Sequence, residues 1–207
     1  MEILNNFIVF EGLDGSGTTT QLNILTENYK LLSPALYRTF EPTDSIIGRL
    51  IRQSLRKEPE LAPQTLAYLF AADRYEHILG NNGIKERCNA GELVVCDRYI
   101  PSSLVYQGLS CNEELPALLN KDFPMPELLI FLDIDAEIAA KRLKDRPHKE
   151  IFEYLDFQKR AGDLYKKVLK ELSIRGVRVE ILNADEEQDL IAAKIWEQIE
   201  KMPIFSK

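Results

Sequence analysis

Near the N-terminus, glycines and hydroxyl residues recur at a spacing that suits the binding of phosphate groups. Gly12, Gly15 and Gly17 come after the apolar run at residues 7–10, and three threonines follow them. The spacing from Gly12 to Gly17 is that of the P-loop, G-x-x-x-x-G-K-[ST], in which backbone N–H groups and a helix N-terminus surround phosphates. In that motif the Thr19 hydroxyl is offered to Mg²⁺. The predicted polyphosphate-binding loop consists of Gly12, Leu13, Asp14, Gly15, Ser16, Gly17, Thr18, Thr19 and Thr20.

One position of this loop departs from the motif. Thr18 stands where the P-loop lysine reaches the β- and γ-phosphates, and a hydroxyl supplies a hydrogen bond without a charge. Loss of a preorganised cation lowers a rate a hundredfold or more, which is on the order of 3 kcal/mol. Phosphoryl transfer by this chain therefore needs compensation from lid arginines or Mg²⁺, or its rate is low. The alternative is a glycine turn between a strand and a helix in some other α/β fold.

A second group of reactive side chains follows another apolar run. Residues 93–96 read LVVC, and Asp97 and Arg98 come next. A carboxylate at the end of a buried strand suits Mg²⁺ or its water shell, and the guanidinium fork of Arg98 suits phosphate oxygens. A structural Asp–Arg ion pair is the alternative. The phosphate-binding loop in the same chain favours the metal site.

Strand-like and helix-like patterns alternate along the whole chain. The predicted strands are 7–10, 35–40, 93–96, 128–134 and 177–182. The predicted helices are 19–29, 45–55, 63–88, 136–144, 152–172 and 186–201. Continuous apolar strands separated by amphipathic helices indicate an α/β fold with a parallel sheet covered on both faces, and residues 1–207 are expected to form one domain.

Composition limits the partners. The net charge of −7 argues against a protein that coats nucleic acid, and no apolar run reaches the ~20 residues that span a bilayer. The three cysteines are scattered, which fits reduced thiols and shows no zinc-site spacing. We expect a cytoplasmic protein with small-molecule partners, and neither a membrane nor a nucleic acid among them.

Several motifs together resemble the thymidylate kinase family. Residues 10–17 read FEGLDGSG, residues 39–44 read TFEPTD, and residues 70–74 read FAADR. Residues 97–99 read DRY and lead through two serines to YQG at 106–108, and LDID at 132–135 precedes Arg142. The match is in the family's order over nearly the full length. It implies a three-layer P-loop kinase fold, with a five-stranded parallel sheet flanked by helices and a short lid at about 142–152.

The resemblance also implies an activity and the residues that serve it. The reaction would be transfer of the ATP γ-phosphoryl group to dTMP with Mg²⁺. Relatives are homodimers packed through helices, and a homodimer is expected here because the predicted helices 45–55 and 63–88 carry enough apolar positions to supply such a surface. Asp14 resembles the carboxylate that contacts the acceptor sugar, Phe70 the ring that stacks on thymine, and Arg74 the group that reads its O4 edge. The remaining dTMP positions are Arg98 for the phosphate, Ser102 and Ser103 at the base edge, Tyr106 against a ribose 2′-hydroxyl, and Gln158 as a nucleotide-side contact. The plain alternatives are a core ring for Phe70, a solvated charge for Arg74 and a surface glutamine for Gln158.

The family supplies lid cations in two ways. Some members carry an arginine inside the P-loop, and others place basic residues in the lid. Gly15 follows Asp14 here, so this chain resembles the second type, with Arg146 expected on the phosphates and Arg142 against adenine. Thr43 is a further departure, since it stands near where relatives often place a phosphate-binding arginine. The alternative for the lid is an ordinary solvated basic turn.

Three functional hypotheses follow. The first is a dTMP kinase with an altered P-loop, whose catalytic residues are Asp14, Asp97, Arg98 and Arg146. The second is a catalytically impaired nucleotide-binding module. The third is a P-loop kinase that acts on a deoxynucleoside.

Overall fold

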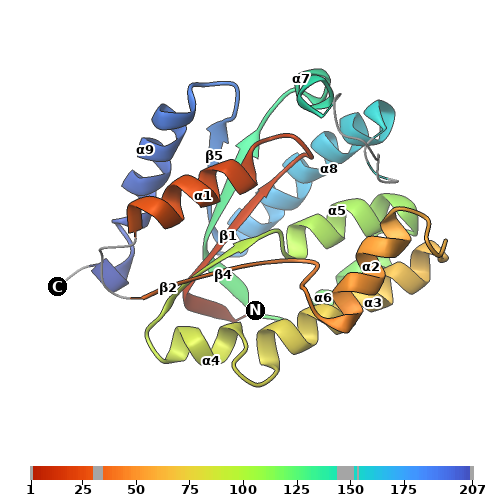
Figure 1. Ribbon diagram of the computed structural model, residues 1–207, viewed down its shortest axis with the longest axis horizontal. Coiled ribbons are helices and arrows are strands. Elements are labelled where there is room, and N and C mark those ends of the chain that lie inside the picture. Colours follow the sequence, from red (N-terminus) through yellow and green to blue (C-terminus); the bar gives the residue numbers. More distant parts are fainter. Residues whose placement is uncertain (1, 30–34, 144–151, 153, 206–207) are drawn as a thin grey trace.

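The computed structural model describes residues 2–29, 35–143, 152 and 154–205. Its centre is a parallel sheet of five strands in the order β2-β3-β1-β4-β5 (Figure 1). The strands are β1 (Ile3–Gly12), β2 (Leu36–Phe40), β3 (Leu93–Asp97), β4 (Met125–Asp133) and β5 (Arg178–Asn183). The predicted α/β class with a five-stranded parallel sheet is confirmed.

The register of the central strands brings the glycine-rich loop after β1 close to Asp97 at the end of β3. Phe10 of β1 is paired with Asp97 at the end of β3, and Phe40 at the end of β2 is paired with the same residue. Loops that leave the carboxyl ends of parallel strands meet at one edge of the sheet. The phosphate-binding loop, Asp97 and the segment after β2 therefore share that edge.

Helices cover both faces of the sheet (Figure 1). α1 (Thr18–Tyr29) and α9 (Gln188–Ile199) pack on each other over one face, and α5 (Ile100–Ser110) packs against α8 (Leu155–Ile174) over the other. The other helices are α2 (Ile46–Leu55), α3 (Pro63–Leu79), α4 (Ile84–Asn89), α6 (Glu114–Asn120) and α7 (Ala136–Arg142). The apolar strands explain this arrangement, since Phe7, Val95 and Ile130 are fully buried between the two helical layers.

One prediction about the helices was wrong, and two helices were not predicted. The predicted helix 63–88 is broken into α3 and α4 at Gly80, where a Cβ would lie 2.4 Å from the carbonyl oxygen of Glu76. Helices α5 and α6 were not predicted, because α5 buries residues on nearly all its sides and lacks the polar face that marks an amphipathic helix. None of the described helices is long and apolar enough to cross a membrane.

Candidate active site

The phosphate-binding loop is a tight turn between β1 and α1. Gly15 and Gly17 have φ angles of +90° and +97°, which side-chain-bearing residues rarely adopt. Room is also limited, because a Cβ on Gly15 would lie 2.6 Å from the carbonyl oxygen of Ala139. Leu13 through Thr20 line an open cleft of about 760 Å³, together with Arg142, and Gly12 ends β1 directly before this lining. The predicted polyphosphate-binding residues are thus gathered around one cleft.

The charge of this cleft is unusual for a site that holds phosphates. Five carboxylates line it, from Asp14, Asp97, Asp185, Glu186 and Glu187. Two guanidiniums oppose them among the described lining residues, those of Arg98 and Arg142, and Arg142 is already 3.5 Å from Asp185. A polyphosphate would be repelled here unless cations came with it.

Thr18 lies at the position of the missing lysine. Its side chain is 7% exposed and lines the cleft at the first turn of α1. A lysine at this position would add an ammonium group to a cleft that has few cations. The predicted lid cation Arg146 lies outside the residues that the structure describes.

Asp97 and Thr19 provide oxygen ligands that fit Mg²⁺. The Thr19 hydroxyl donates to Asp97 Oδ2 at 2.8 Å, while Asp97 Oδ1 is buried and has no hydrogen-bond partner among the described residues. No group of three or more His, Cys, Asp or Glu side chains with metal-binding geometry occurs in the described part of the chain. One carboxylate and one hydroxyl suit Mg²⁺ that is shared with substrate phosphates.

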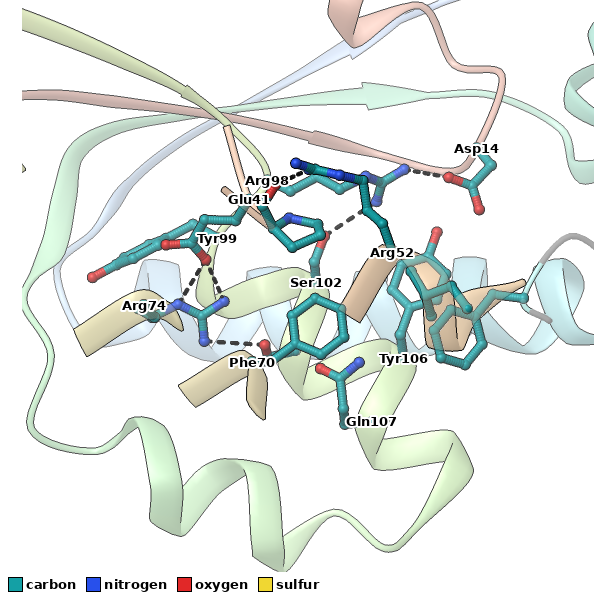
Figure 2. Close-up of a pocket in the computed structure, with 14 residues that line it drawn as sticks. Asp14, Glu41, Arg52, Phe70, Arg74, Arg98, Tyr99, Ser102, Tyr106 and Gln107 are labelled. Carbon is teal, nitrogen blue, oxygen red and sulfur yellow. Dashed lines mark hydrogen bonds and ion pairs between the residues drawn. The ribbon is translucent and has the colours of Figure 1, made fainter. Parts of the chain in front are cut away.

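Arg98 lies between this cleft and a second, smaller cavity. Its guanidinium donates to Asp14 Oδ1 at 2.6 Å (Figure 2). It also donates to Ser102 Oγ and to the Gly12 carbonyl, at 3.2 Å each. Burial opposes the charge, but Tyr106 and Asp14 raise the pKa of Arg98 well above its ordinary value. The result is a permanent cation shared by the two spaces.

The second cavity measures about 170 Å³ and brings together the predicted acceptor residues (Figure 2). It is much smaller than the cleft at the glycine-rich loop, which measures about 760 Å³. Gln158 is not part of the lining, but its amide donates to Asp14 Oδ2 at 3.1 Å and to the Phe152 carbonyl at 2.6 Å. The lining consists of Asp14, Glu41, Pro42, Arg52, Leu55, Phe70, Arg74, Arg98, Tyr99, Ser102, Ser103, Tyr106, Gln107 and Phe152.

Arg74 is held on several sides in this cavity. Its Nε and Nη2 donate to Glu41 Oε2 at 2.9 and 2.6 Å, and its Nη1 donates to Ser103 Oγ at 3.0 Å and to Asn120 Oδ1. The guanidinium also lies 5.0 Å from the centre of the Tyr99 ring. With 1% of its surface exposed, Arg74 is a buried, paired cation, and the solvated-charge alternative is excluded.

Glu11 does not line the cavity but holds two of its lining residues, Tyr99 and Ser102. This fully buried carboxylate accepts from the backbone N–H groups of Tyr99 and Ser102, and from the hydroxyls of Ser102 and Tyr165. Burial raises its pKa, although Arg98 and the hydrogen bonds counteract this. Glu11 therefore holds Ser102 and the start of α5 in place. Ser102 in turn accepts a hydrogen bond from Arg98, so Glu11 also helps to position Arg98.

Sequence reasoning missed several lining residues. Arg52 of α2 donates to the Thr43 carbonyl at 2.6 Å and adds a cation near the place where Thr43 departs from the family pattern. Thr43 itself is bound by its N–H and hydroxyl to Asp73, at 2.7 and 2.6 Å. The sequence did contain a signal for Arg52, since it is a basic residue in the helix that follows the segment TFEPTD at residues 39–44. Glu41, Gln107 and Phe152 carried no local signal, because only the packing of separate helices brings them to the cavity.

Comparison with known proteins finds proteins that are similar to this chain in sequence and in structure. The family model described as thymidylate kinase matches residues 10–195. A Treponema pallidum protein that carries the name of a thymidylate kinase is 38% identical over 191 residues, which cover 92% of this chain and 91% of that protein. A probable thymidylate kinase of Pyrobaculum aerophilum is 35% identical over 200 residues, covering 96% and 98%. A solved thymidylate kinase of Candida albicans superposes with a TM-score of 0.81 at 27% identity, covering 95% of this chain and 91% of that one.

Proposed function

The chain belongs to the thymidylate kinase family, and on that premise we propose that it transfers the γ-phosphoryl group of ATP to dTMP. An oxygen of the dTMP phosphate attacks the γ-phosphorus, the bond to the β,γ-bridging oxygen breaks, and dTDP and ADP leave. The observation that carries the proposal is the position of Arg98. Arg98 lines both the cleft at the glycine-rich loop and the smaller cavity, which is where an in-line transfer between two bound nucleotides would need a cation.

In the larger cleft, the backbone N–H groups of the loop at residues 12–20 would hold the ATP phosphates. Thr19 and Asp97 would hold Mg²⁺, which when bound neutralises charge on the β- and γ-phosphates. The acidic lining supports a strict requirement for that metal. We assign Arg142 to the adenine side, since it lines the cleft beside Ala184 and Asp185.

In the smaller cavity, Arg98 would bind the dTMP phosphate and Asp14 the 3′-hydroxyl of the sugar. Phe70 lines the cavity from α3 and would stack on thymine, while Tyr106 would stand against a ribose 2′-hydroxyl. Ser102 and Ser103 would complete the polar contacts, and Gln158, which lies outside the lining, would act on the nucleotide side through its hydrogen bond to Asp14. A fixed cation at the acceptor phosphate favours a monophosphate over a bare deoxynucleoside, which makes a deoxynucleoside kinase the weaker reading.

The hydrogen bonds made by the N–H groups of Arg74 support a pyrimidine carbonyl as its ligand. A guanidinium has five N–H groups, and four of those on Arg74 are directed to Glu41, Ser103 and Asn120. The fifth, on Nη2, has no partner among the described residues. One free donor in a buried site suits one acceptor atom, such as O4 of thymine, and conflicts with the amino group of cytosine.

This donor count predicts an order of substrates. We expect kcat/KM for dCMP to be on the order of 100-fold lower than for dTMP, because two donors would face each other at Arg74. dUMP is the matched control, since it keeps O4 and lacks only the methyl group, and its loss should be about tenfold or less. Coupled ADP-release kinetics with the three monophosphates measures the order, and equal values for dCMP and dTMP would exclude the assignment.

A second prediction concerns the missing lysine. If the loop holds phosphates without its usual cation, Thr18→Lys should raise kcat, because the ammonium would meet phosphates already positioned by the backbone. The gain should be larger in an Arg146→Ala background than in the wild type, as expected for two cations that act on one developing charge. Single-turnover kinetics of the four proteins measures this. Equal gains in both backgrounds would remove Arg146 from the site.

We also propose that the protein is a cytoplasmic homodimer. On α3, Tyr68, Tyr75 and Leu79 are 57%, 56% and 43% exposed and lie on one face of the helix, and Ile46 of the adjacent α2 is 80% exposed. These apolar side chains would be buried against a second copy. Sedimentation should then report twice the 23.8 kDa mass of the chain.

The free thiols of Cys88, Cys96 and Cys111 support a reducing compartment.

A further inference from the structure

His77 lies behind the acceptor cavity and takes no part in its lining. Its Nδ1 is 3.0 Å from Glu41 Oε1, and its Nε2 is 2.6 Å from the Thr39 hydroxyl. The side chain of His77 is 9% exposed and that of Glu41 is 3% exposed. Thr39, His77, Glu41 and Arg74 therefore form a buried chain of hydrogen bonds that ends at the cavity.

From this chain we infer that His77 is a positioning residue for dTMP recognition, acting through Glu41 on Arg74. The inference rests on the proposed function and adds a residue to it.

The two oxygens of Glu41 have different partners. Oε2 accepts both bonds from Arg74, at 2.9 and 2.6 Å, and Oε1 accepts from His77. A buried carboxylate oxygen without a donor is costly, so loss of the imidazole would favour rotation of the carboxylate toward other donors. Rotation would move Oε2 and release Arg74 from the orientation that leaves one N–H free for the ligand.

The geometry also fixes the tautomer. A carboxylate carries no hydrogen, so Nδ1 must be the donor toward Glu41. In the neutral ring Nε2 is then the acceptor, and the Thr39 hydroxyl donates to it. His77 and Arg74 are three residues apart on α3, so both side chains extend from the same face of the helix toward Glu41.

Three substitutions separate the two ends of the imidazole. His77→Asn keeps a donor near the place of Nδ1, His77→Gln keeps a polar group near the place of Nε2, and His77→Phe keeps the ring shape with neither. We expect KM for dTMP to rise about tenfold in the Gln and Phe variants and to stay within about threefold of the wild type in the Asn variant. KM for ATP should be unchanged in all three, because the phosphate cleft does not include His77.

A merely structural role would not produce this split. The inference is overturned if the three variants behave alike, or if KM for ATP rises together with KM for dTMP. If the wild type made no dTDP, the proposed function would fall, and calorimetric dTMP binding to the same variants would still decide the role of His77.

Nitrogen NMR of the wild type tests the same point without any folding risk. The chain has two histidines, His77 and His148, and a His148→Gln variant assigns the spectrum. We expect the neutral ring of His77 to carry its proton on Nδ1. A neutral ring with its proton on Nε2 and none on Nδ1 would contradict the hydrogen bond to Glu41 and with it the inference.

Discussion

Replacement of Arg98 by alanine is expected to lower kcat/KM for dTMP by two to three orders of magnitude. Arg98 is the cation shared by the two cavities, and its side chain is half-buried, so water screens its charge less than it would on the open surface. Removal would leave the acceptor phosphate beside Asp14 without its neutralising partner. Steady-state kinetics with dTMP as the varied substrate measures the loss.

Arg98→Lys is the informative second variant. It keeps a positive charge but not the guanidinium fork that reaches Asp14, Ser102 and the Gly12 carbonyl together, so we expect it to recover only part of the activity. Arg87→Ala is the matched control, because Arg87 of α4 pairs with Glu92, lies over the Tyr37 ring and lines neither cavity. An Arg98→Ala enzyme within threefold of the wild type would remove Arg98 from the reaction.

Arg74→Ala is expected to lower the free energy of unfolding by about 3–5 kcal/mol, which is large for one residue. The substitution removes both hydrogen bonds to Glu41 Oε2 and leaves a carboxylate that is 3% exposed without its counter-charge. Ser103 and Asn120 would lose their donor as well. Urea denaturation at constant m-value measures the change.

A double-mutant cycle distinguishes the ion pair from simple packing. Glu41→Ala combined with Arg74→Ala removes both charges, so its loss should be smaller than the sum of the single losses by about 2 kcal/mol. Additive losses would mean that the two side chains act independently, against the buried pair described above. Because Arg74→Ala perturbs folding, the substrate series dTMP, dUMP and dCMP is the cleaner test of the role of Arg74 in recognition.

The site was predictable where its chemistry is local. The glycine spacing of residues 12–17 and the carboxylate after β3 are set by a few neighbouring residues, and parallel pairing of β1 with β3 brings them together. The motifs of the family then placed Phe70, Arg74 and Tyr106, which the structure gathers around one cavity. Their individual roles in binding remain predictions that the experiments above address.

The rest depends on contacts between distant segments. Glu41 and Arg74 are 33 residues apart, and Arg74 and Asn120 are 46 apart. No local sequence pattern therefore predicts either hydrogen-bonded pair. The same holds for Glu11 and Tyr165, which meet only because α8 packs on α5. Helix α5 was missed for a related reason, since burial on most sides removes the periodicity by which a helix is recognised.

The most direct test of the account is to identify the products of the wild-type protein. The chain is mixed with ATP, dTMP and Mg²⁺, and ADP and dTDP are quantified together by chromatography. We expect the two to appear in equal amounts, with neither formed when dTMP or Mg²⁺ is left out, because the proposed transfer needs both cavities and a metal ion held by Thr19 and Asp97. Calorimetric binding of dTMP and ATP without any dTDP would contradict the account and identify the chain as a nucleotide-binding module that performs no transfer.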